Sequence, residues 1–205
     1  MKQLLFSLIA LLAISSSAQK PEQVSLGTIR NKLTERNLEI TANYIKGDLY
    51  GIEIECPVQD QKLGLVTKGT IIVKADDLQQ FRDVLGKLRP AMDILKGDVE
   101  KNGYEEASIG LDNIPFKVTY KWGALNHENK GDFEVFVTRD ANGCYWSSIR
   151  HMAKNDYEDG EECPFFLQFR SLYEVDYMLT ILSDENITLS KKKHDLLVRI
   201  KQDTN

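Results

Sequence analysis

Cysteine and histidine are the side chains of this sequence that could perform nucleophilic catalysis. The 205-residue chain has three of each, and the histidines are His127, His151 and His194. Cys144 and His151 stand seven residues apart. On one strand they would point to opposite faces and lie roughly 23 Å apart, at about 3.3 Å per residue. A thiol–imidazole pair therefore requires a helix between them.

The cysteines Cys56, Cys144 and Cys163 are an odd number, so at least one is unpaired within the chain. A disulfide between Cys144 and Cys163 is feasible if "SSIRHMAKN" forms a short helix between two strand ends. It is not feasible if both lie on a hairpin turning at Asp159 and Gly160, because they would be offset by several residues. The sequence leaves both arrangements open.

An acidic run offers carboxylates that could bind calcium; its members are Asp156, Glu158, Asp159, Glu161 and Glu162. Tyr157 stands where an oxygen ligand is needed, so a solvated charged loop is the favoured interpretation. The usual hydrolase, metalloprotease and phosphate-binding signatures do not occur. We predict no catalytic residues, no metal site and no cofactor, and we leave enzyme activity uncertain.

Aromatic residues are concentrated in the second half of the sequence. Of 18 aromatic residues, 14 fall between Tyr104 and Tyr177. Neighbouring aromatics such as Tyr145 and Trp146 point to opposite faces of a strand, and one helical layer cannot bury both. Either these strands are covered on both sides, or one face is exposed and binds something. The candidate ligand- or partner-binding residues are Trp122, Phe136, Tyr145, Trp146 and Phe166.

Strands that would position these aromatics are indicated by alternating apolar residues. They are expected at 38–44, 50–56, 63–74, 114–122, 133–137, 144–149 and 163–169. Turns are expected at residues 46–48, at "NHENKG" and at "DANG". A short leading helix is expected within 22–36, weakened by Gly27.

Two long amphipathic helices are predicted at 77–101 and 172–184. The first has an apolar residue every three or four positions, Asp76 or Asp77 as its cap and "KNG" as its stop, with Pro90 off the apolar stripe. A short final helix, "SKKKHDLLVRIK", is expected to be capped by Ser190. Its basic cluster, "KKKH", is interpreted as a solvated helix face.

The order of elements predicts an α+β fold, a mainly antiparallel sheet with the two long helices packed on it. In both halves, about 37–103 and 114–185, the last strand runs into a helix, which suggests a strand-strand-strand-helix pseudo-repeat within a single domain, 19–205. A helix arriving directly from the last strand is the shortest cover for the apolar face of its sheet.

The amino terminus is typical of a secretory signal peptide, residues 1–18. Lys2 precedes an apolar run from Leu4 to Ile14, too short to span a bilayer comfortably, and a cut is expected before Gln19. The chain is therefore expected to be exported, periplasmic or extracellular, without a membrane span in its mature form. The net charge of −5 gives no electrostatic reason to bind nucleic acid or an anionic membrane surface.

These features favour an exported, non-catalytic protein that binds an unknown protein partner or a small apolar ligand through the aromatic-rich second half. The alternative is a periplasmic hydrolase that uses carboxylates or Cys144. A homodimer would cover an exposed aromatic face, and the tail helix 190–202, with Leu196, Leu197 and Ile200, is its competitor for the same face.

Overall fold

The computed structural model describes residues 21–30, 37–59, 66–111, 114–122, 125–154 and 162–204. The proposed signal peptide lies outside these residues. The strands are β1 (Glu22–Arg30), β2 (Asn37–Ile45), β3 (Asp48–Gln59), β4 (Val66–Lys74), β5 (Ala107–Gly110), β6 (Ile114–Trp122), β7 (Leu125–Arg139), β8 (Tyr145–Lys154) and β9 (Glu162–Phe169). The helices are the short 3-10 helix η1 (Ala75–Asp77), α2 (Leu78–Asn102), α3 (Leu172–Ile181) and α4 (Asp184–Asp203).

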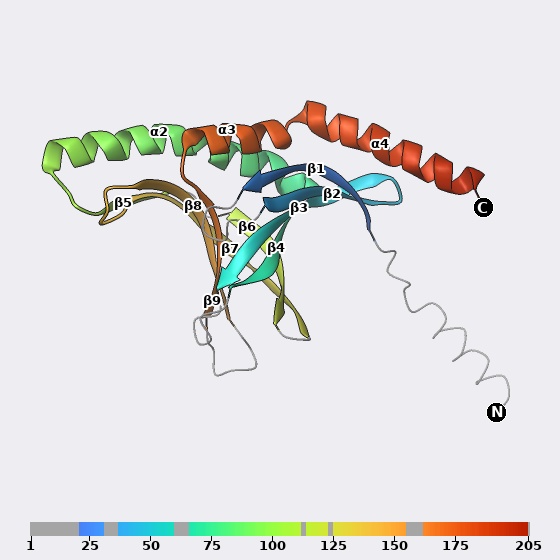
Figure 1. Cartoon of the computed structure of the whole chain (residues 1–205), viewed down its shortest axis with the longest axis horizontal. Helices are drawn as coiled ribbons and strands as arrows, with labels where there is room; N and C mark the ends of the chain where they lie inside the picture. The colour runs from blue at the N-terminus through green and yellow to red at the C-terminus, as the bar shows by residue number, and fades with distance from the viewer. Residues whose placement is uncertain are drawn as a thin grey trace.

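The predicted α+β class is confirmed, with every described strand pairing antiparallel in one curved sheet. The strand order is β1-β2-β3-β4-β6-β7-β8-β9, and β5 pairs with β7 beside β6. A further pairing joins β3 to β9 where Val58 lies opposite Phe165. This pairing closes six strands, from β3 through β9, into a ring. The helices form a layer over one side of the sheet, and the curled strands descend from it (Figure 1).

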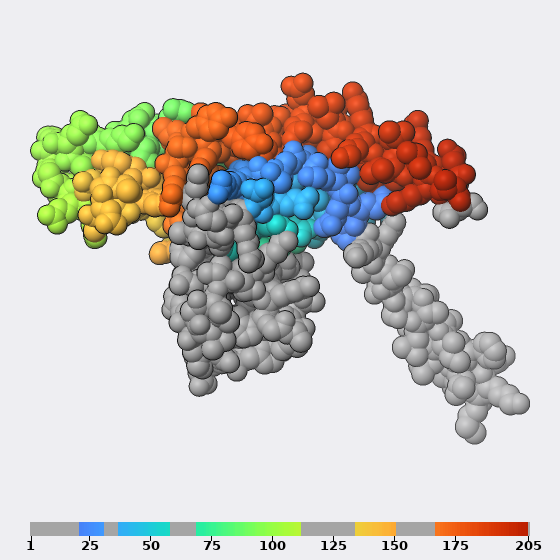
Figure 2. Space-filling model, viewed as in Figure 1, coloured from blue at the N-terminus to red at the C-terminus, as the bar shows by residue number. Residues whose placement is uncertain are grey.

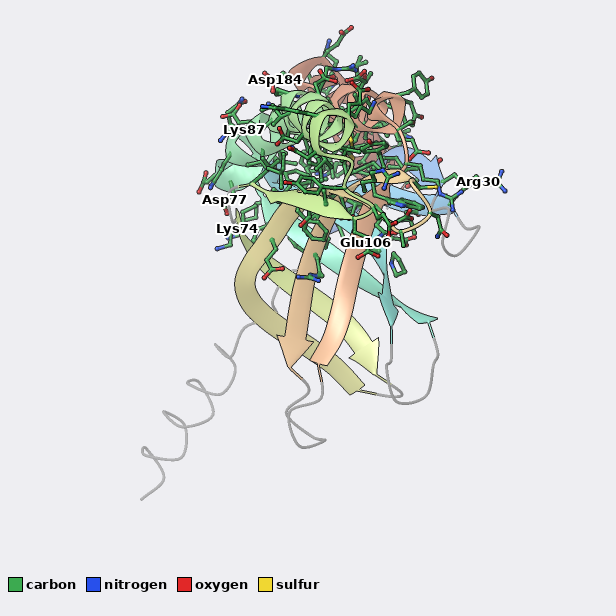
Figure 3. The ribbon with its side chains drawn as sticks, turned by 90° about the vertical axis from the view of Figure 1, so that its left-hand side faces the viewer. Arg30, Lys74, Asp77, Lys87, Glu106 and Asp184 are labelled. Atoms are coloured by element: carbon green, nitrogen blue, oxygen red, sulfur yellow. The ribbon has the colours of Figure 1, made fainter. Side chains whose placement is uncertain are left out.

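The helices cover strands from the other half of the sequence. α2 follows β4 and contacts it, but it packs mostly on β7 and β5 and also touches β8. α3 contacts β1 as well as its own preceding strand β9, and α4 contacts β1 and β2. Figure 3 shows the helical layer, marked by Lys87 and Asp184, above the strands, and Glu106 directly precedes β5. α2 therefore covers its own preceding strands only in part and lies mostly on strands of the second half. The pseudo-repeat and the single domain stay predictions.

The core lies between this helical layer and the inner face of the sheet. Alternate strand residues supply the sheet side, and the apolar stripe of α2 with one face of α3 supplies the helix side. Its fully buried members include Ile40, Ile52, Ile54, Ile71, Val73, Val135, Val137, Ile149, Leu167 and Phe169 from strands, and Phe81, Leu85, Leu88, Leu95 and Met178 from helices.

The predicted leading helix is wrong, because this segment forms strand β1. A bulge between Ser25 and Gly27 shifts the register of β1 against β2. As a result Val24 and Ile29, five residues apart, both point into the core. Gly27 also allows α3 to approach closely, since an added Cβ would lie 3.1 Å from Ile181. Because of the bulge, the buried residues of this strand have a spacing in the sequence that resembles that of a helix.

Helix α2 was predicted almost to the residue. Asp77 is its N-cap residue, although its side chain makes no capping hydrogen bond, and Gly103 ends the helix with φ of 68°. Pro90 lies on the exposed face. The turn expected at 46–48 is also confirmed, because Lys46 and Gly47 both have positive φ, as a tight hairpin requires.

Several boundaries differ from the prediction: α3 ends at Ile181 and not at 184, and β8 continues to Lys154. The "NHENKG" segment belongs to β7, which pairs with β6 down to Leu125 and Trp122, so it is not a turn. The tail helix begins near Ser183, whose Oγ accepts a hydrogen bond from the Asn186 N–H at 3.2 Å, rather than at Ser190. Among the described helices, none combines the length and apolarity needed to cross a lipid bilayer.

Candidate functional site

The aromatic residues of the second half lie on strands whose two faces have different surroundings. Val135 and Val137 of β7 and Ile149 of β8 point toward the helical layer and are buried. Strand alternation therefore places Phe136 and Trp146 on the opposite face, which we call the outer face. Its described residues are Glu134, Phe136, Thr138, Trp146, Ser148, Arg150, Gln168 and Arg170.

The register arranges this outer face in three cross-strand rows. Thr138 pairs with Trp146, and Arg170 comes next in that row because Phe169 pairs with Ser147. The second row is Phe136, Ser148 and Gln168, and the third is Glu134 and Arg150 followed by the backbone of Phe166. Directly opposite residues have Cβ atoms about 5 Å apart, so the members of a row can touch.

The Phe136 ring lies under a guanidinium group. The Cζ atom of Arg150 is 5.2 Å from the ring centroid, within the range of a cation–π interaction. Arg150 also donates to Glu134 Oε2, with Nε at 3.1 Å. The carboxylate therefore fixes the cation over the ring, and it neutralises this part of the face.

Trp146 is held at its indole N–H group and at one face of its ring. Its indole Nε1–H donates to Asp140 Oδ2 at 2.9 Å, and Arg170 Cζ lies 4.8 Å from the ring centroid. Asp140 Oδ1 also accepts from the backbone N–H groups of Cys144 and Asn142 within the "DANG" turn. The indole N–H first, and then the Cys144 N–H, hold the pKa of the Asp140 carboxyl below its ordinary value. The turn thus fixes the orientation of Trp146.

Two polar atoms of the outer face lack hydrogen-bond partners. Thr138 Oγ1 and Gln168 Oε1 are buried, and neither has a partner in the described part of the chain. Buried polar atoms are normally paired, and leaving one unpaired costs about 1–3 kcal/mol. A ligand that displaces the side chains over these oxygens and donates hydrogen bonds to them would remove that cost.

A shallow hollow of about 450 Å³ lies beside the second and third rows. Its lining includes Phe136, Thr138 and Arg150, and on the β5 side Ser108, Gly110 and Leu111. Gly110 leaves open space there, because an added Cβ would meet no atom within 4 Å. The hollow extends the outer face toward the edge strand β5.

The structure separates the five predicted site residues. Phe136 and Trp146 share the outer face, but Tyr145 points to the helical side, where Lys96 Nζ of α2 lies 5.5 Å from its ring. Trp122 and Phe166 lie on β6 and β9, and their side chains fall outside the described residues. Of the five predicted residues, only Phe136 and Trp146 have described side chains on the outer face.

Sequence reasoning missed the polar members of the face. Arg150 follows Trp146 by four residues, and Arg170 follows Gln168 by two, so strand alternation alone could have placed each pair on one face. The predicted binding residues were all aromatic and did not include the cations over their rings.

Disulfide and thiol chemistry receive no support from the described residues. Cys144 and Cys56 are both free. Cys144 adjoins the start of β8, whereas Cys163 pairs with Ala153 nine residues further along, about 30 Å away at 3.3 Å per residue. A bridge to Cys144 is therefore excluded. Burial raises the pKa of the Cys56 thiol, which disfavours the reactive thiolate.

The described residues also give no support to a Cys144–His151 pair or to a metal site. "SSIRHMAKN" belongs mostly to β8, so the helix that could bring Cys144 and His151 together is not formed. Most of the acidic run lies outside the described residues. Within the described ranges, no group of three His, Cys, Asp or Glu residues could hold a metal ion.

A second polar cluster fastens α4 to β1 and β2. His194 Nε2 lies 2.6 Å from Glu22 Oε2, and its Nδ1 lies 3.2 Å from Asp195 Oδ1. The imidazole ring packs on the Tyr44 ring, centroid to centroid 4.5 Å, and the Tyr44 hydroxyl lies 2.5 Å from Ser190 Oγ. His194 and Ser190 are both buried. Tyr44, Ser190 and His194 are buried and bonded to one another or to Glu22 and Asp195, so the cluster holds α4 on the sheet.

No protein-family model matches this chain, and no match is found among curated proteins or solved structures.

Proposed function

We propose that this chain is an exported, non-catalytic binding protein that recognises an extended acidic segment of a partner protein through the outer face of β7–β9. The observation that carries the proposal is the Arg170 guanidinium over Trp146. It makes no ion pair with any described residue, and it stands in the same row as the unpartnered Thr138 Oγ1.

Arg170 is suited to bind a carboxylate. Stacking on an indole leaves the N–H edge of a guanidinium available, and that edge matches a carboxylate with two parallel hydrogen bonds. Because Asp140 fixes Trp146, the platform beneath Arg170 is already oriented before binding. A preorganised site loses less conformational entropy on binding.

Gln168 supplies the complementary acceptor. Its unpartnered Oε1 needs a donor, and a peptide backbone N–H is a donor of suitable strength. An acidic peptide carries both a carboxylate for Arg170 and backbone N–H groups for the oxygens beneath it. A small apolar ligand is less favoured, because guanidinium groups lie over both described rings of this face.

Pairing two copies through this face is also less favoured. A two-fold axis would bring Arg150 and Arg170 of one copy toward the same residues of the other, and like charges oppose such contact. The tail does not compete for this face, since α4 packs on β1 and β2. A dimer through the outer face is thus an outcome that the test must distinguish.

The test is a tryptophan-fluorescence titration with a glutamate-rich peptide of about ten residues. We expect Arg170→Ala to weaken binding about 10- to 100-fold, because a hydrogen bond to a charged group contributes about 1.5–3 kcal/mol. Arg89→Ala is the matched control, since this exposed arginine pairs with Asp176 on the helical side. Absence of peptide binding, equal binding by the two variants, or preference for polygalacturonate would contradict the proposal.

Export is a separate part of the proposal and rests on the first eighteen residues. The mature protein should begin at Gln19 and be found outside the cytoplasm, which cell fractionation and amino-terminal sequencing can measure. Deleting residues 2–18 should retain the chain in the cytoplasm. A mature chain that still starts at Met1 would show this part to be wrong.

A further inference from the structure

Helix α4 turns its apolar residues toward water. Leu189, Leu196 and Ile200 are 54%, 58% and 51% exposed. They stand at i, i+7 and i+11, so they form one stripe along the helix. On the opposite side, Ser190 and His194 are 5% and 3% exposed and face the sheet. Apart from Ile187 in its first turns, which packs against the core, the helix packs through polar groups and presents its apolar stripe to solvent.

Cations flank this stripe on both sides. At 100° per residue, Lys192 and Arg199 fall on one side of the stripe and Lys193 on the other. All three side chains are exposed, and no ion pair links them to another described residue. By contrast, Lys191 and Lys201 are bound to Asp195 and Glu22. Exposed Glu185 and Asp203 fall on the same side as Lys192, but near the two ends of the helix. The outward face is therefore apolar and positively charged in its middle part, residues 189–200, on a chain whose net charge is −5.

The geometry points to an anionic lipid surface as the partner of this face. An apolar stripe flanked by lysine and arginine is the pattern of a helix that lies in the plane of a membrane interface. The three apolar side chains would enter the boundary between headgroups and acyl chains, and the long cationic side chains would reach the anionic headgroups. We infer that α4 docks the protein on such a surface, independently of the acidic-partner site.

Shape and charge favour lipid over protein. α4 forms a convex ridge along the outer end of the helical layer (Figure 2). A lipid surface accepts a convex ridge without a matching groove, whereas a protein partner must supply one. Antiparallel pairing of two α4 helices would place Lys192, Lys193 and Arg199 of both copies together, and repulsion opposes it. Of the "KKKH" cluster, Lys192 and Lys193 are exposed, as a solvated helix face requires, whereas His194 is buried against the sheet.

The test is flotation of the full chain with vesicles of phosphatidylglycerol and phosphatidylcholine, compared with phosphatidylcholine alone. We expect the chain to float with the anionic vesicles and to partition much less onto neutral ones. Replacing Lys192, Lys193 and Arg199 by Gln should lower the partition coefficient about fivefold per charge. High salt should weaken binding in the same direction, because it screens the charges.

A second variant removes the apolar contribution. Leu196→Ser with Ile200→Ser should lower partitioning at least about tenfold, since binding scales with the buried apolar area. Both side chains are exposed, so the fold should persist, which circular dichroism can verify. Ile94→Ser on α2 is the control, because Ile94 is 59% exposed but lies outside the stripe, and it should change nothing.

Three results would overturn the inference. The first is failure of the chain to float with anionic vesicles. The second is equal binding to both kinds of vesicle with no effect of the Gln variants. The third is a dimer in sedimentation that dissociates when Leu196 and Ile200 are replaced, which would make a second copy the occupant of the stripe.

Discussion

Helices α2 and α4 are both long and amphipathic, and both lie on the same side of the sheet, but they present opposite faces to it. α2 buries Phe81, Leu85, Leu88 and Leu95 against the strands. α4 buries Ser190 and His194 instead, and its leucines face water. The difference is that α2 is held by the removal of apolar surface from water, whereas α4 is held largely by hydrogen bonds.

The two kinds of contact differ in strength and in what they require. Burial of a leucine side chain contributes about 1.5–3 kcal/mol, whereas a hydrogen bond contributes about 1 kcal/mol net and needs a fixed geometry. The contacts of α4 include Tyr44 with Ser190, His194 with Glu22, and Asn186 Nδ2, which donates to Leu26 O at 3.2 Å. We expect α4 to separate from the sheet more easily than α2.

The largest expected difference comes from one leucine in each helix. Leu85→Ala in α2 should lower the free energy of unfolding by about 2–5 kcal/mol, because it leaves a cavity in the core. Leu196→Ala in α4 should change it by less than about 0.5 kcal/mol, because the side chain is exposed. Urea denaturation measures both. Similar losses in the two variants would mean that the comparison between the helices is wrong.

The same contrast explains how much of the fold the sequence could predict. The 3-4 pattern of α2 predicted both the helix and its buried face. For α4 the pattern predicted a helix whose Leu196 and Ile200 could cover the aromatic face, but both side chains face water. The groups that decide its orientation, Tyr44 and Glu22, lie more than 140 positions away. The local periodicity of a sequence cannot predict contacts between residues so far apart in the chain.

The candidate site likewise could not be located from local sequence patterns alone. Alternation correctly separates Tyr145 from Trp146, but it does not say which face the helices cover. That choice depends on α2 crossing to the second half of the sheet, which no local pattern encodes. Arg170 and Trp146 are 24 positions apart, and only the register of β8 with β9 brings them together.

A smaller effect is expected from the hydrogen bonds of α4. Tyr44→Phe removes the hydroxyl next to Ser190 Oγ and preserves the ring that packs on His194. Ser190 Oγ still donates to Ile187 O at 2.8 Å, so the buried serine keeps a partner. We expect a loss of about 0.5–1.5 kcal/mol and faster hydrogen exchange in α4 than in α2. Tyr173→Phe, at an exposed position of α3, is the control and should alter neither quantity.

A substitution that raises helix propensity in α2 should increase stability, in contrast to the preceding variants. Gly97 lies on the exposed face of α2, and an added Cβ would meet no atom within 4 Å. Gly97→Ala should therefore raise the free energy of unfolding by about 0.5–1 kcal/mol. Gly103→Ala, at the left-handed C-terminus of the same helix, should lower it by about 1 kcal/mol. Thermal unfolding should resolve the two signs, and equal signs would contradict the assignment of the helix end.

The smallest expected effect is on the pH dependence of α4, which rests on Glu22 and Asp195. The hydrogen bond with His194 first, and then that from Lys201, lower the pKa of Glu22 below its ordinary value of 4.5. Lys191 first, and then His194, lower the pKa of Asp195 below its ordinary value of 3.8. Both side chains are partly open to solvent, with 40% and 44% exposed, so water weakens these interactions.

A folded-state pKa below the ordinary value has a definite consequence for stability. The ionised carboxylate stabilises the docked helix at pH values above the ordinary pKa, and this contribution is lost as the pH falls through the lowered folded-state pKa. Because the apolar contacts of α2 do not titrate, acid below about pH 4.5 should loosen α4 before α2. Hydrogen exchange of the two helices, corrected for the intrinsic rate at each pH, measures this order. Glu22→Gln should reduce the protection of α4 already at neutral pH and flatten its pH dependence. If α4 in that variant loosens in acid as steeply as in the original chain, Glu22 does not hold it.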